Sequence, residues 1–201
     1  MVSMLSAFPS RASWLLAGLF LAQDVAAAQR LSQFSHSVWR TQDGLFTSPN
    51  AIAQTADGYI WLGTDRGLVR FDGIRFVDAS VSTGASAGEF KVYAVLGTRD
   101  GKLWVAGGKK VVSIDGSHVT RYAVPSQPAV LIEDAKAGVW LGETRGPGGS
   151  PVCHLSEGNV ECFGPPTVPM KYASVLAQAD DGSLWIGSSS GLCHWQRDES
   201  P

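Results

Sequence analysis

A short segment built around a tryptophan recurs four times along this chain. Its fullest copy, Asp57–Gly63, reads Asp-Gly-Tyr-Ile-Trp-Leu-Gly, and its last copy, Asp181–Gly187, reads Asp-Gly-Ser-Leu-Trp-Ile-Gly. Weaker copies surround Trp104 and Trp140, and successive tryptophans lie roughly 40 residues apart. Repeats of this length that combine short apolar runs with glycine turns are typical of propeller blades. The repeat therefore predicts an all-β fold, a β-propeller of about four blades of four-stranded antiparallel sheet.

The repeated residues all have roles in building a blade. Asp-Gly pairs supply the positive φ angles that tight hairpins require. The tryptophans stack between neighbouring blades, and the glycine two positions later lets adjacent sheets approach closely. The residues assigned to this structural repeat are Trp61, Gly63, Trp104, Trp140, Gly142, Trp185 and Gly187.

Turn signals divide the chain into successive blades. A strand at Phe34–Arg40 and a lead-in make up residues 29–49, and the blades are expected at about 50–80, 90–123, 128–163 and 172–201. The last of these has three recognisable strands, so the N-terminal strand would complete it if a four-bladed ring closes here. We favour the alternative, an incomplete part of a larger propeller of about seven blades, because an open arc leaves apolar sheet faces unprotected.

The N-terminus has the pattern of an export signal. Arg11 precedes the apolar run Trp14–Ala22, and the small residues Ala26–Ala28 follow as an Ala-x-Ala cleavage site. The run is too short to span a membrane, and a buried helix is the alternative interpretation. The pattern predicts a signal peptide over 1–28, cleaved near Ala28, and an exported, periplasmic protein without a later membrane span.

Two of the three cysteines flank a predicted hairpin turn. With Glu157 and Gly158 as its central pair, Cys153 would lie directly opposite Cys162, and Asp72-Gly73 and Asp115-Gly116 are expected to form the same turn. In an oxidising compartment a disulfide between these cysteines is one outcome. Two free, half-buried thiols are the other, because directly paired strand positions often strain the bridge.

Composition narrows the function classes. The chain has 16 basic and 18 acidic residues without a basic stripe, which disfavours nucleic-acid binding. The four histidines are scattered, and only His154 and His194, on third strands of adjacent blades, are expected to approach each other. No metal site, catalytic residue or cofactor is therefore predicted.

Ligands of propellers generally lie over the central channel, near the ends of the inner strands. Five residues fall near the starts of those strands and are the candidate ligand-binding residues: Asn50, Lys91, Tyr93, Tyr172 and Ser174. An aromatic ring beside amide, hydroxyl and amine groups suits a glycan fragment or another small molecule. Plain connector residues are the alternative interpretation.

The repeat resembles the two-component regulator propeller repeats of bacterial sensor proteins. Asp57–Phe71 fits the family pattern nearly throughout, Asp181–Trp195 fits well, and Trp39–Leu45 resembles the usual opening before the first blade. The resemblance implies a periplasmic sensor domain of a hybrid histidine kinase or a diguanylate cyclase, with further blades and signalling domains as partners. No kinase or cyclase motif occurs in this chain, so it is not expected to be an enzyme.

Three functional hypotheses follow. The first, which we favour, is a non-catalytic ligand-sensing or interaction propeller of a two-component-type receptor that takes part in signal transduction by phosphorelay. The sequence leaves open whether this propeller is whole or truncated. The second is a secreted propeller enzyme similar to streptogramin lyases, whose blades contain similar tryptophans. The third is a gene fragment without independent function.

Overall fold

The computed structural model describes residues 35–44, 47–79, 91–136, 138–145 and 150–197 of the 201-residue chain. The chain divides into two compact units, residues 1–38 and 39–201. The signal peptide predicted over 1–28 lies outside the described residues. In the described part of the chain, no helix is long and apolar enough to span a bilayer.

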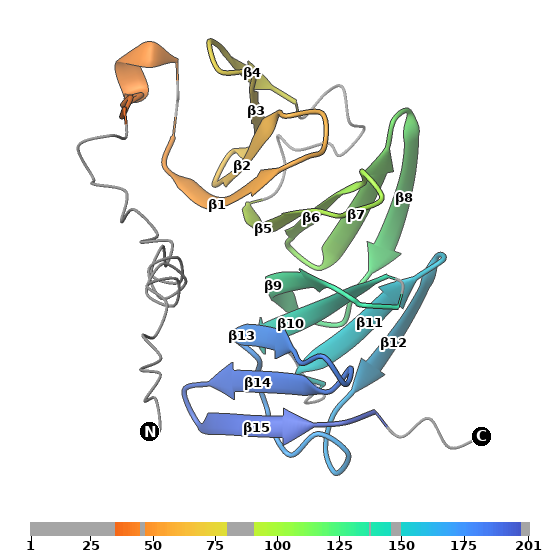
Figure 1. The fold of residues 1–201 in the computed structure, drawn as a ribbon. Coiled ribbons are helices and arrows are strands. Elements are labelled where there is room, and N and C mark those ends of the chain that lie inside the picture. The colour runs from red at the N-terminus through yellow and green to blue at the C-terminus, as the bar shows by residue number, and fades with distance from the viewer. Residues whose placement is uncertain (1–34, 45–46, 80–90, 137, 146–149, 198–201) are drawn as a thin grey trace, which may run out of the picture. The chain divides into compact units, whose positions relative to one another are not determined.

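The described residues of the second unit form four antiparallel sheets, each with its strands in chain order (Figure 1). Blade 1 consists of β1 (Pro49–Gln54), β2 (Ile60–Thr64), β3 (Gly67–Phe71) and β4 (Phe76–Asp78). Blade 2 consists of β5 (Val92–Gly97), β6 (Leu103–Gly107), β7 (Lys110–Asp115) and β8 (His118–Ala123). Blade 3 consists of β9 (Gln127–Glu133), β10 (Val139–Arg145), β11 (Val152–Ser156) and β12 (Asn159–Phe163). Blade 4 consists of β13 (Val175–Gln178), β14 (Leu184–Ser188) and β15 (Gly191–Trp195). The predicted fold class, an all-β propeller, is confirmed.

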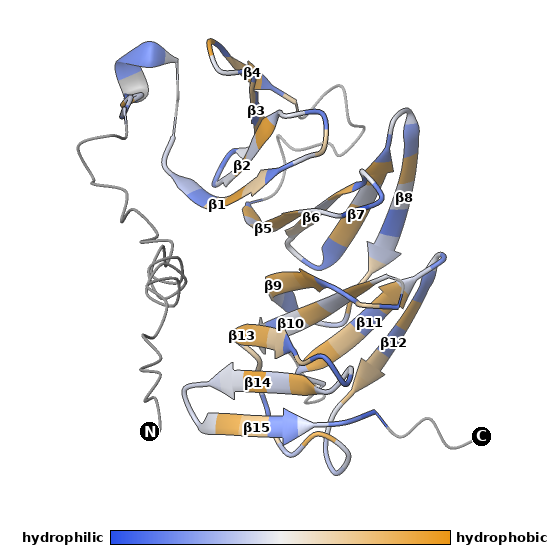
Figure 2. Cartoon of the chain, viewed as in Figure 1, coloured by the Kyte–Doolittle hydropathy of each residue, from blue (hydrophilic) through white to orange (hydrophobic). Residues whose placement is uncertain are grey.

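Apolar clusters join successive blades. The inner strands β1, β5, β9 and β13 contact one another in that order. Each of three clusters draws its buried side chains from two successive blades, and prominent members are Leu68 and Val92, Leu131 and Tyr122, and Trp140 and Ile186. The outer strands β8 and β12 instead alternate between hydrophilic and hydrophobic residues (Figure 2). The core is therefore a series of interfaces between sheets, as repeat architectures require.

Three of the four repeat tryptophans pack toward the blade that follows them. Trp104 is 5% exposed in the cluster shared with blade 3, and Trp140 is 3% exposed in the cluster shared with blade 4. Trp61 packs, partly buried, on the cluster shared with blade 2. Trp185 belongs to blade 4 and is 43% exposed. The burial of a repeat tryptophan thus depends on the sheet that comes next.

Two of the repeat glycines are sites of close approach between blades. A Cβ atom at Gly63 would lie 2.5 Å from Val92 Cγ1 of blade 2, and one at Gly142 would lie 2.8 Å from the Ala173 carbonyl oxygen beside blade 4. At Gly187 the obstacle is Val175 of the same blade, 2.6 Å away. Only a hydrogen atom fits at Gly63 and Gly142 without movement of the neighbouring sheet.

Side-chain hydrogen bonds explain why the repeat combines Asp with Trp. Thr55 Oγ1 donates to Asp57 Oδ1 at 2.5 Å and accepts from Trp61 Nε1 at 2.9 Å. Thr98 Oγ1 donates in the same way to Asp100 Oδ1, at 2.5 Å. These bonds fasten the turn between the first and second strands to the second strand itself.

The strand predicted at Phe34–Arg40 is wrong for its described residues, 35–40, which form no strand. Asp43 closes a short 3-10 helix (Thr41–Asp43) instead. The Arg40 N–H donates to Asp43 Oδ2 at 2.6 Å, and the Asp43 N–H donates to the Arg40 carbonyl at 2.8 Å. The backbone is committed to this local turn, while the Trp39 ring packs edge-on against Phe71 with centroids 4.9 Å apart.

The connection between β11 and β12 has the predicted two-residue turn. Ser156 pairs with Asn159, and the central residues Glu157 and Gly158 have φ angles of +47° and +85°. Positive φ at both positions is the type I′ geometry that matches strand twist. Cys153 consequently pairs with Cys162, and the two form a disulfide.

The prediction that two other hairpins share this turn is wrong. In blade 2 the central pair is Gly116-Ser117, because Asp115 itself pairs with His118. In blade 1 four residues, Asp72–Arg75, separate the paired Phe71 and Phe76. The Asp72 carboxylate accepts from the N–H groups of residues 74 and 75 at 2.8 and 2.7 Å, and this Asx-type bonding stabilises the longer loop.

Close packing at Gly63 generates a stability prediction. Gly63→Ala should lower the free energy of unfolding by about 1–3 kcal/mol, because the new methyl group would overlap Val92. In a Val92→Ala background the same change should cost about 1 kcal/mol less. Urea denaturation of the four proteins measures this coupling. Equal costs in both backgrounds would contradict the proposed contact between blades.

Candidate functional site

Three of the five predicted ligand-binding residues come together at one end of the sheets. We call the end where the inner strands begin the proximal end, and the other the distal end. At the proximal end, Asn50 Nδ2 donates to Asp65 Oδ1 at 2.7 Å and to the Val92 carbonyl at 3.3 Å. Lys91 Nζ lies 2.8 Å from Asp65 Oδ1 and 5.5 Å from the centroid of the Tyr93 ring. Asn50, Asp65, Lys91 and Tyr93 form the proximal cluster, which spans blades 1 and 2.

Local backbone irregularities position two of these side chains. The pairing of β1 with β2 shifts register between Pro49 and Ala51, which leaves Asn50 at a bulge. The pairing of β5 with β6 shifts in the same way between Val92 and Ala94, at Tyr93. Bulges re-aim side chains and are frequent beside functional sites. Sequence reasoning missed both, because each bulge falls at the first residues of its strand, where no alternation precedes it that could reveal a shift.

The aspartate of the proximal cluster was also missed. Asp65 lies in the turn between β2 and β3, where Thr64 Oγ1 donates to the Gly67 carbonyl and accepts from the Arg66 N–H. Pro49 at the start of β1 pairs with Thr64 at the end of β2, so the turn that contains Asp65 lies beside the start of the inner strand. Pairing the two predicted strands antiparallel would have indicated this position.

Charge in the proximal cluster is balanced and accessible. Hydrogen bonds from Lys91 and then Asn50 lower the pKa of Asp65, and the Asp65 hydrogen bond raises the pKa of Lys91. The side chains of Lys91 and Asp65 are 42% and 55% exposed. An ammonium, a carboxylate, an amide and a ring are thus presented to solvent together, an arrangement suited to binding a polar ligand.

The remaining two predicted residues are in blade 4. Tyr172 is 41% exposed, and the Ser174 N–H donates to the Gly187 carbonyl at 2.9 Å. Among the described contacts, none joins either residue to the proximal cluster. The structure therefore brings Asn50, Lys91 and Tyr93 together but leaves Tyr172 and Ser174 apart from them.

A polar network that sequence reasoning missed joins three blades at the distal end. Arg99 Nε of blade 2 pairs with Glu133 Oε2 of blade 3 at 3.0 Å. Gln178 Nε2 of blade 4 donates to Asp134 Oδ1 at 2.7 Å, and its Oε1 accepts from the Ala135 N–H at 2.8 Å. These bonds link the ends of successive inner strands.

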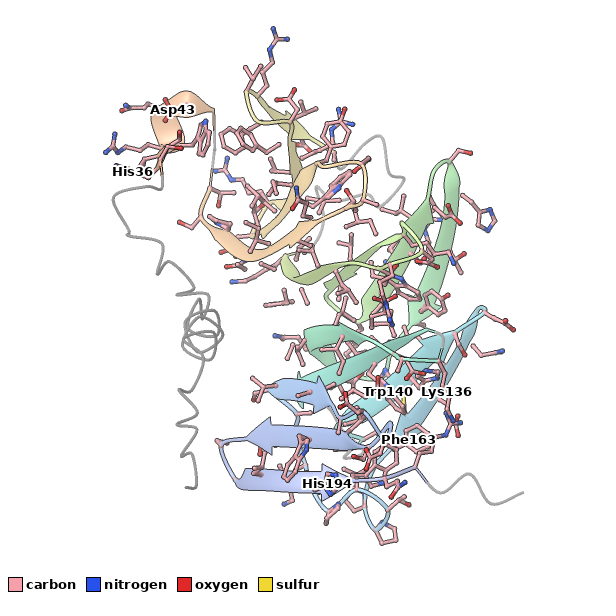
Figure 3. The ribbon with its side chains drawn as sticks, viewed as in Figure 1. His36, Asp43, Lys136, Trp140, Phe163 and His194 are labelled. Carbon is pink, nitrogen blue, oxygen red and sulfur yellow. A yellow bond between two sulfur atoms is a disulfide. The ribbon has the colours of Figure 1, made fainter. Side chains whose placement is uncertain are left out.

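Asp134 is the centre of this network. Its Oδ2 lies 3.1 Å from His154 Nε2, and both residues are buried. Burial raises the pKa of Asp134, but the Gln178 hydrogen bond and the nearby His154 outweigh it, so the net pKa is lowered. The His154 ring packs on Trp140 with centroids 4.5 Å apart, and Figure 3 shows Trp140 near Lys136 and Phe163 on blade 3.

A position in the repeat could have identified Asp134. The residue six before each repeat tryptophan is Thr55, Thr98, Asp134 and Ala179 in the four blades. Asp134 thus occupies the position where blades 1 and 2 have the threonine that hydrogen-bonds the turn.

His194 has a partner within its own blade, since its Nε2 lies 2.7 Å from Ser183 Oγ. Among the described residues, no group of three or more metal-ligating side chains is found.

Three hollows formed by described residues lie at the distal end. One of 880 Å³ between blades 2 and 3 is lined by Asp100, Asp115, Glu133 and Lys136 among others. A second of 1050 Å³ between blades 3 and 4 is lined by Asp134, His154, Gln178 and Arg197 among others, and a third of 390 Å³ includes Arg99 and Gln178. The proximal cluster lines none of these three hollows.

Asp134 generates a prediction about pH. Its pKa in the folded state lies below the ordinary value of 3.8, so its ionised form stabilises the fold above that value, and this stabilisation is lost as pH falls through the folded-state pKa. Asp134→Asn should therefore lower the free energy of unfolding at pH 7 and flatten its decline between about pH 5 and pH 2. Asp180→Asn, at an exposed residue of the same end, is the control. Parallel pH profiles for native and Asp134→Asn proteins would contradict this role.

Comparisons with known proteins agree with this fold. The sequence profile described as "Two component regulator propeller" matches residues 44–66. Among curated proteins, none matches the sequence. The extracellular domain of a protein described as a one component system, from B. thetaiotaomicron, superposes with a TM-score of 0.60 at 18% identity over 84% of this chain and 23% of that chain.

Two further structures are similar at the level of the fold. Another structure of the extracellular domain of that same B. thetaiotaomicron protein, there described as a hybrid two component system, gives a TM-score of 0.57 at 20% identity over 75% of this chain. A catalytically inactive virginiamycin B lyase from Staphylococcus aureus, solved with quinupristin, gives 0.57 at 16% identity over 82% of this chain. This chain spans 21% of the first structure and 60% of the second. The chain is a β-propeller that carries a two component regulator propeller repeat.

Proposed function

We propose that this chain is the ligand-sensing part of an exported receptor of the two-component type. The observation that carries the proposal is the proximal cluster, where Asn50, Asp65, Lys91 and Tyr93 of two blades present polar groups and a ring to solvent. The matched repeat and the extracellular domains of similar fold support a sensory role. Signalling output would come from further domains or from a partner, and the chain itself would act by binding.

The ligand that this surface favours is an acidic saccharide. Three further exposed basic residues lie at the proximal end: Arg66 in the turn after β2, Lys109 in the turn after β6, and Lys110 at the start of β7. The distal hollow between blades 2 and 3 is instead lined by five acidic and three basic residues, so an anion is better accommodated at the proximal end. The Tyr93 ring offers a stacking surface for the apolar face of a sugar ring, and Asn50 offers hydrogen bonds to hydroxyl groups.

Replacing Asp65 tests this proposal, because the direction in which the affinity changes depends on the charge of the ligand. Its carboxylate holds Lys91 and competes with an anionic ligand for it. An array of neutral, sulfated and uronic-acid oligosaccharides identifies a binder, and titration calorimetry at two salt concentrations then measures its affinity. Asp65→Asn should tighten binding about two- to fivefold, and Lys91→Ala should weaken it by at least that factor. Added salt should weaken binding to the native protein.

Tyr172→Ala is the matched control, because Tyr172 is an exposed aromatic residue outside the proximal cluster. It should leave the affinity unchanged, whereas Tyr93→Ala should reduce it. If Asp65→Asn weakens binding and Lys91→Ala tightens it, the ligand is cationic and the proposal of an acidic saccharide is wrong. If Gln178→Ala loses binding and the proximal variants do not change it, the ligand binds in the distal hollows and not at the proximal cluster.

The export of the chain is part of the same proposal. The mature protein would begin near Gln29 after removal of residues 1–28. Expression in a bacterial host with N-terminal sequencing of the periplasmic fraction tests this directly. A product that keeps its initiator methionine and stays in the cytoplasm would exclude a periplasmic sensor.

One observation supports an enzyme as the second candidate. His154 and Asp134 form a buried pair at the edge of the 1050 Å³ hollow, and the fold is shared with a virginiamycin B lyase. Incubation with quinupristin tests this candidate by chromatography. The sensor proposal expects no conversion by native protein, whereas conversion that His154→Ala abolishes would establish the enzyme instead.

A further inference from the structure

The two sulfur atoms of the disulfide differ in their surroundings. Cys153 is on β11 and is 0% exposed, within the cluster between blades 2 and 3. Cys162 is on β12, the outermost strand of blade 3, and is partly buried. A thiol from solution therefore reaches the sulfur of Cys162 more readily, and Cys153 would be the group that leaves.

A buried carboxyl group lies beside the inner sulfur. Glu143 is 1% exposed, and its Oε1 lies 3.8 Å from Cys153 Sγ. A disulfide sulfur has no proton to donate, so this contact is not a hydrogen bond in the oxidised protein. Glu143 Oε2 has no hydrogen-bond partner among the described residues. The carboxyl thus points into a site that leaves it incompletely paired.

Among the described residues, no charged side chain is found to balance Glu143. Burial raises the pKa of this carboxyl, and hydrogen bonds from the Ser126 side chain and backbone lower it by less. The other described neighbours are Pro128 opposite it on β9, Cys153 on β11, and Ala173 beside blade 4, none of them charged. Glu143 therefore keeps its proton to a higher pH than an exposed glutamate.

Comparison of the blades argues against a purely structural role for this acid. The residue three after each repeat tryptophan is Thr64, Gly107, Glu143 and Ser188. Thr64 bonds to its own turn, and the other two are small. A glutamate stands at this position only in the blade with the disulfide. Burying a carboxyl group that lacks part of its hydrogen bonds lowers the stability of the fold, and a small residue at this position would not have that cost.

We propose that Cys153–Cys162 is a thiol-exchange site in which Glu143 is the proton donor. A thiolate from a small thiol or a protein dithiol attacks Cys162 Sγ, and a new S–S bond forms as the Cys162–Cys153 bond breaks. The electron pair of that bond stays on Cys153 Sγ, which takes the proton of Glu143. The products are a mixed disulfide on Cys162, a Cys153 thiol and a Glu143 carboxylate. A second thiolate, from another small thiol or from the same dithiol, then attacks the sulfur of the bound thiol. The new S–S bond carries the two reductant sulfurs away as a disulfide, and the electron pair of the mixed disulfide stays on Cys162 Sγ, so the protein is reduced by two electrons.

Reduction kinetics of the full chain test the proposal. Glutathione is the probe, and alkylation with mass spectrometry follows the loss of the disulfide between pH 5 and pH 9. The rate constant per glutathione thiolate should fall in the native protein as pH rises and Glu143 loses its proton. In Glu143→Gln the rate at low pH should drop by about tenfold or more, and the constant should become independent of pH.

A second readout separates this role from an effect on folding. The trapped glutathione adduct should lie on Cys162 in the native protein, located by digestion and mass spectrometry. Glu161→Gln is the control, since Glu161 is an exposed acid next to Cys162, and its variant should shift the rate without removing the pH dependence. An adduct on Cys153, or the same pH profile in native and Glu143→Gln proteins, would overturn the proposal. If Glu143→Gln does not fold, the pH dependence of the rate in Glu143→Asp and the position of the adduct in the native protein still test the proposal.

Discussion

The fold depends on the contact between a tryptophan of one blade and the sheet that follows it. Trp104 and Trp140 are almost wholly buried only because blades 3 and 4 cover them, while Trp185 is 43% exposed. Glycine at Gly63 and Gly142 brings the inner strands close enough for that coverage. A blade buries little apolar surface by itself, so its stability is a property of pairs of sheets.

Variation within the repeat produces the chemistry of the molecule. Blade 3 keeps the tryptophan but replaces the turn threonine with Asp134 and places Glu143 where other blades have small residues. The first change builds a network with His154 and Gln178 across a blade boundary. The second places an acid beside a disulfide. The same backbone frame thus holds charged groups that the repeat itself does not require.

The architecture was predictable from the sequence because the turn and packing rules are local and recur. The cross-strand partner of Cys153 followed from one type I′ turn, yet the blade 1 and blade 2 hairpins differ because Asp72 bonds its own loop and Asp115 pairs with His118. Strand position alone brought Asn50, Lys91 and Tyr93 into the candidate site. Asp65, Asp134 and Glu143 were missed, because their importance arises from contacts between segments that the pattern treats as separate.

The bulges at Asn50 and Tyr93 have a consequence for how such a surface changes over time. A bulged residue takes no part in the regular ladder, so the pairs on either side keep their partners whatever side chain it carries. Substitution at Tyr93 removes no backbone pair, and substitution at Asn50 removes one side-chain hydrogen bond, to the Val92 carbonyl, from the boundary between blades 1 and 2. Blades 1 and 2 can therefore each acquire a new residue at the proximal end with the strand pairing kept, so the binding surface can change while the repeat stays the same.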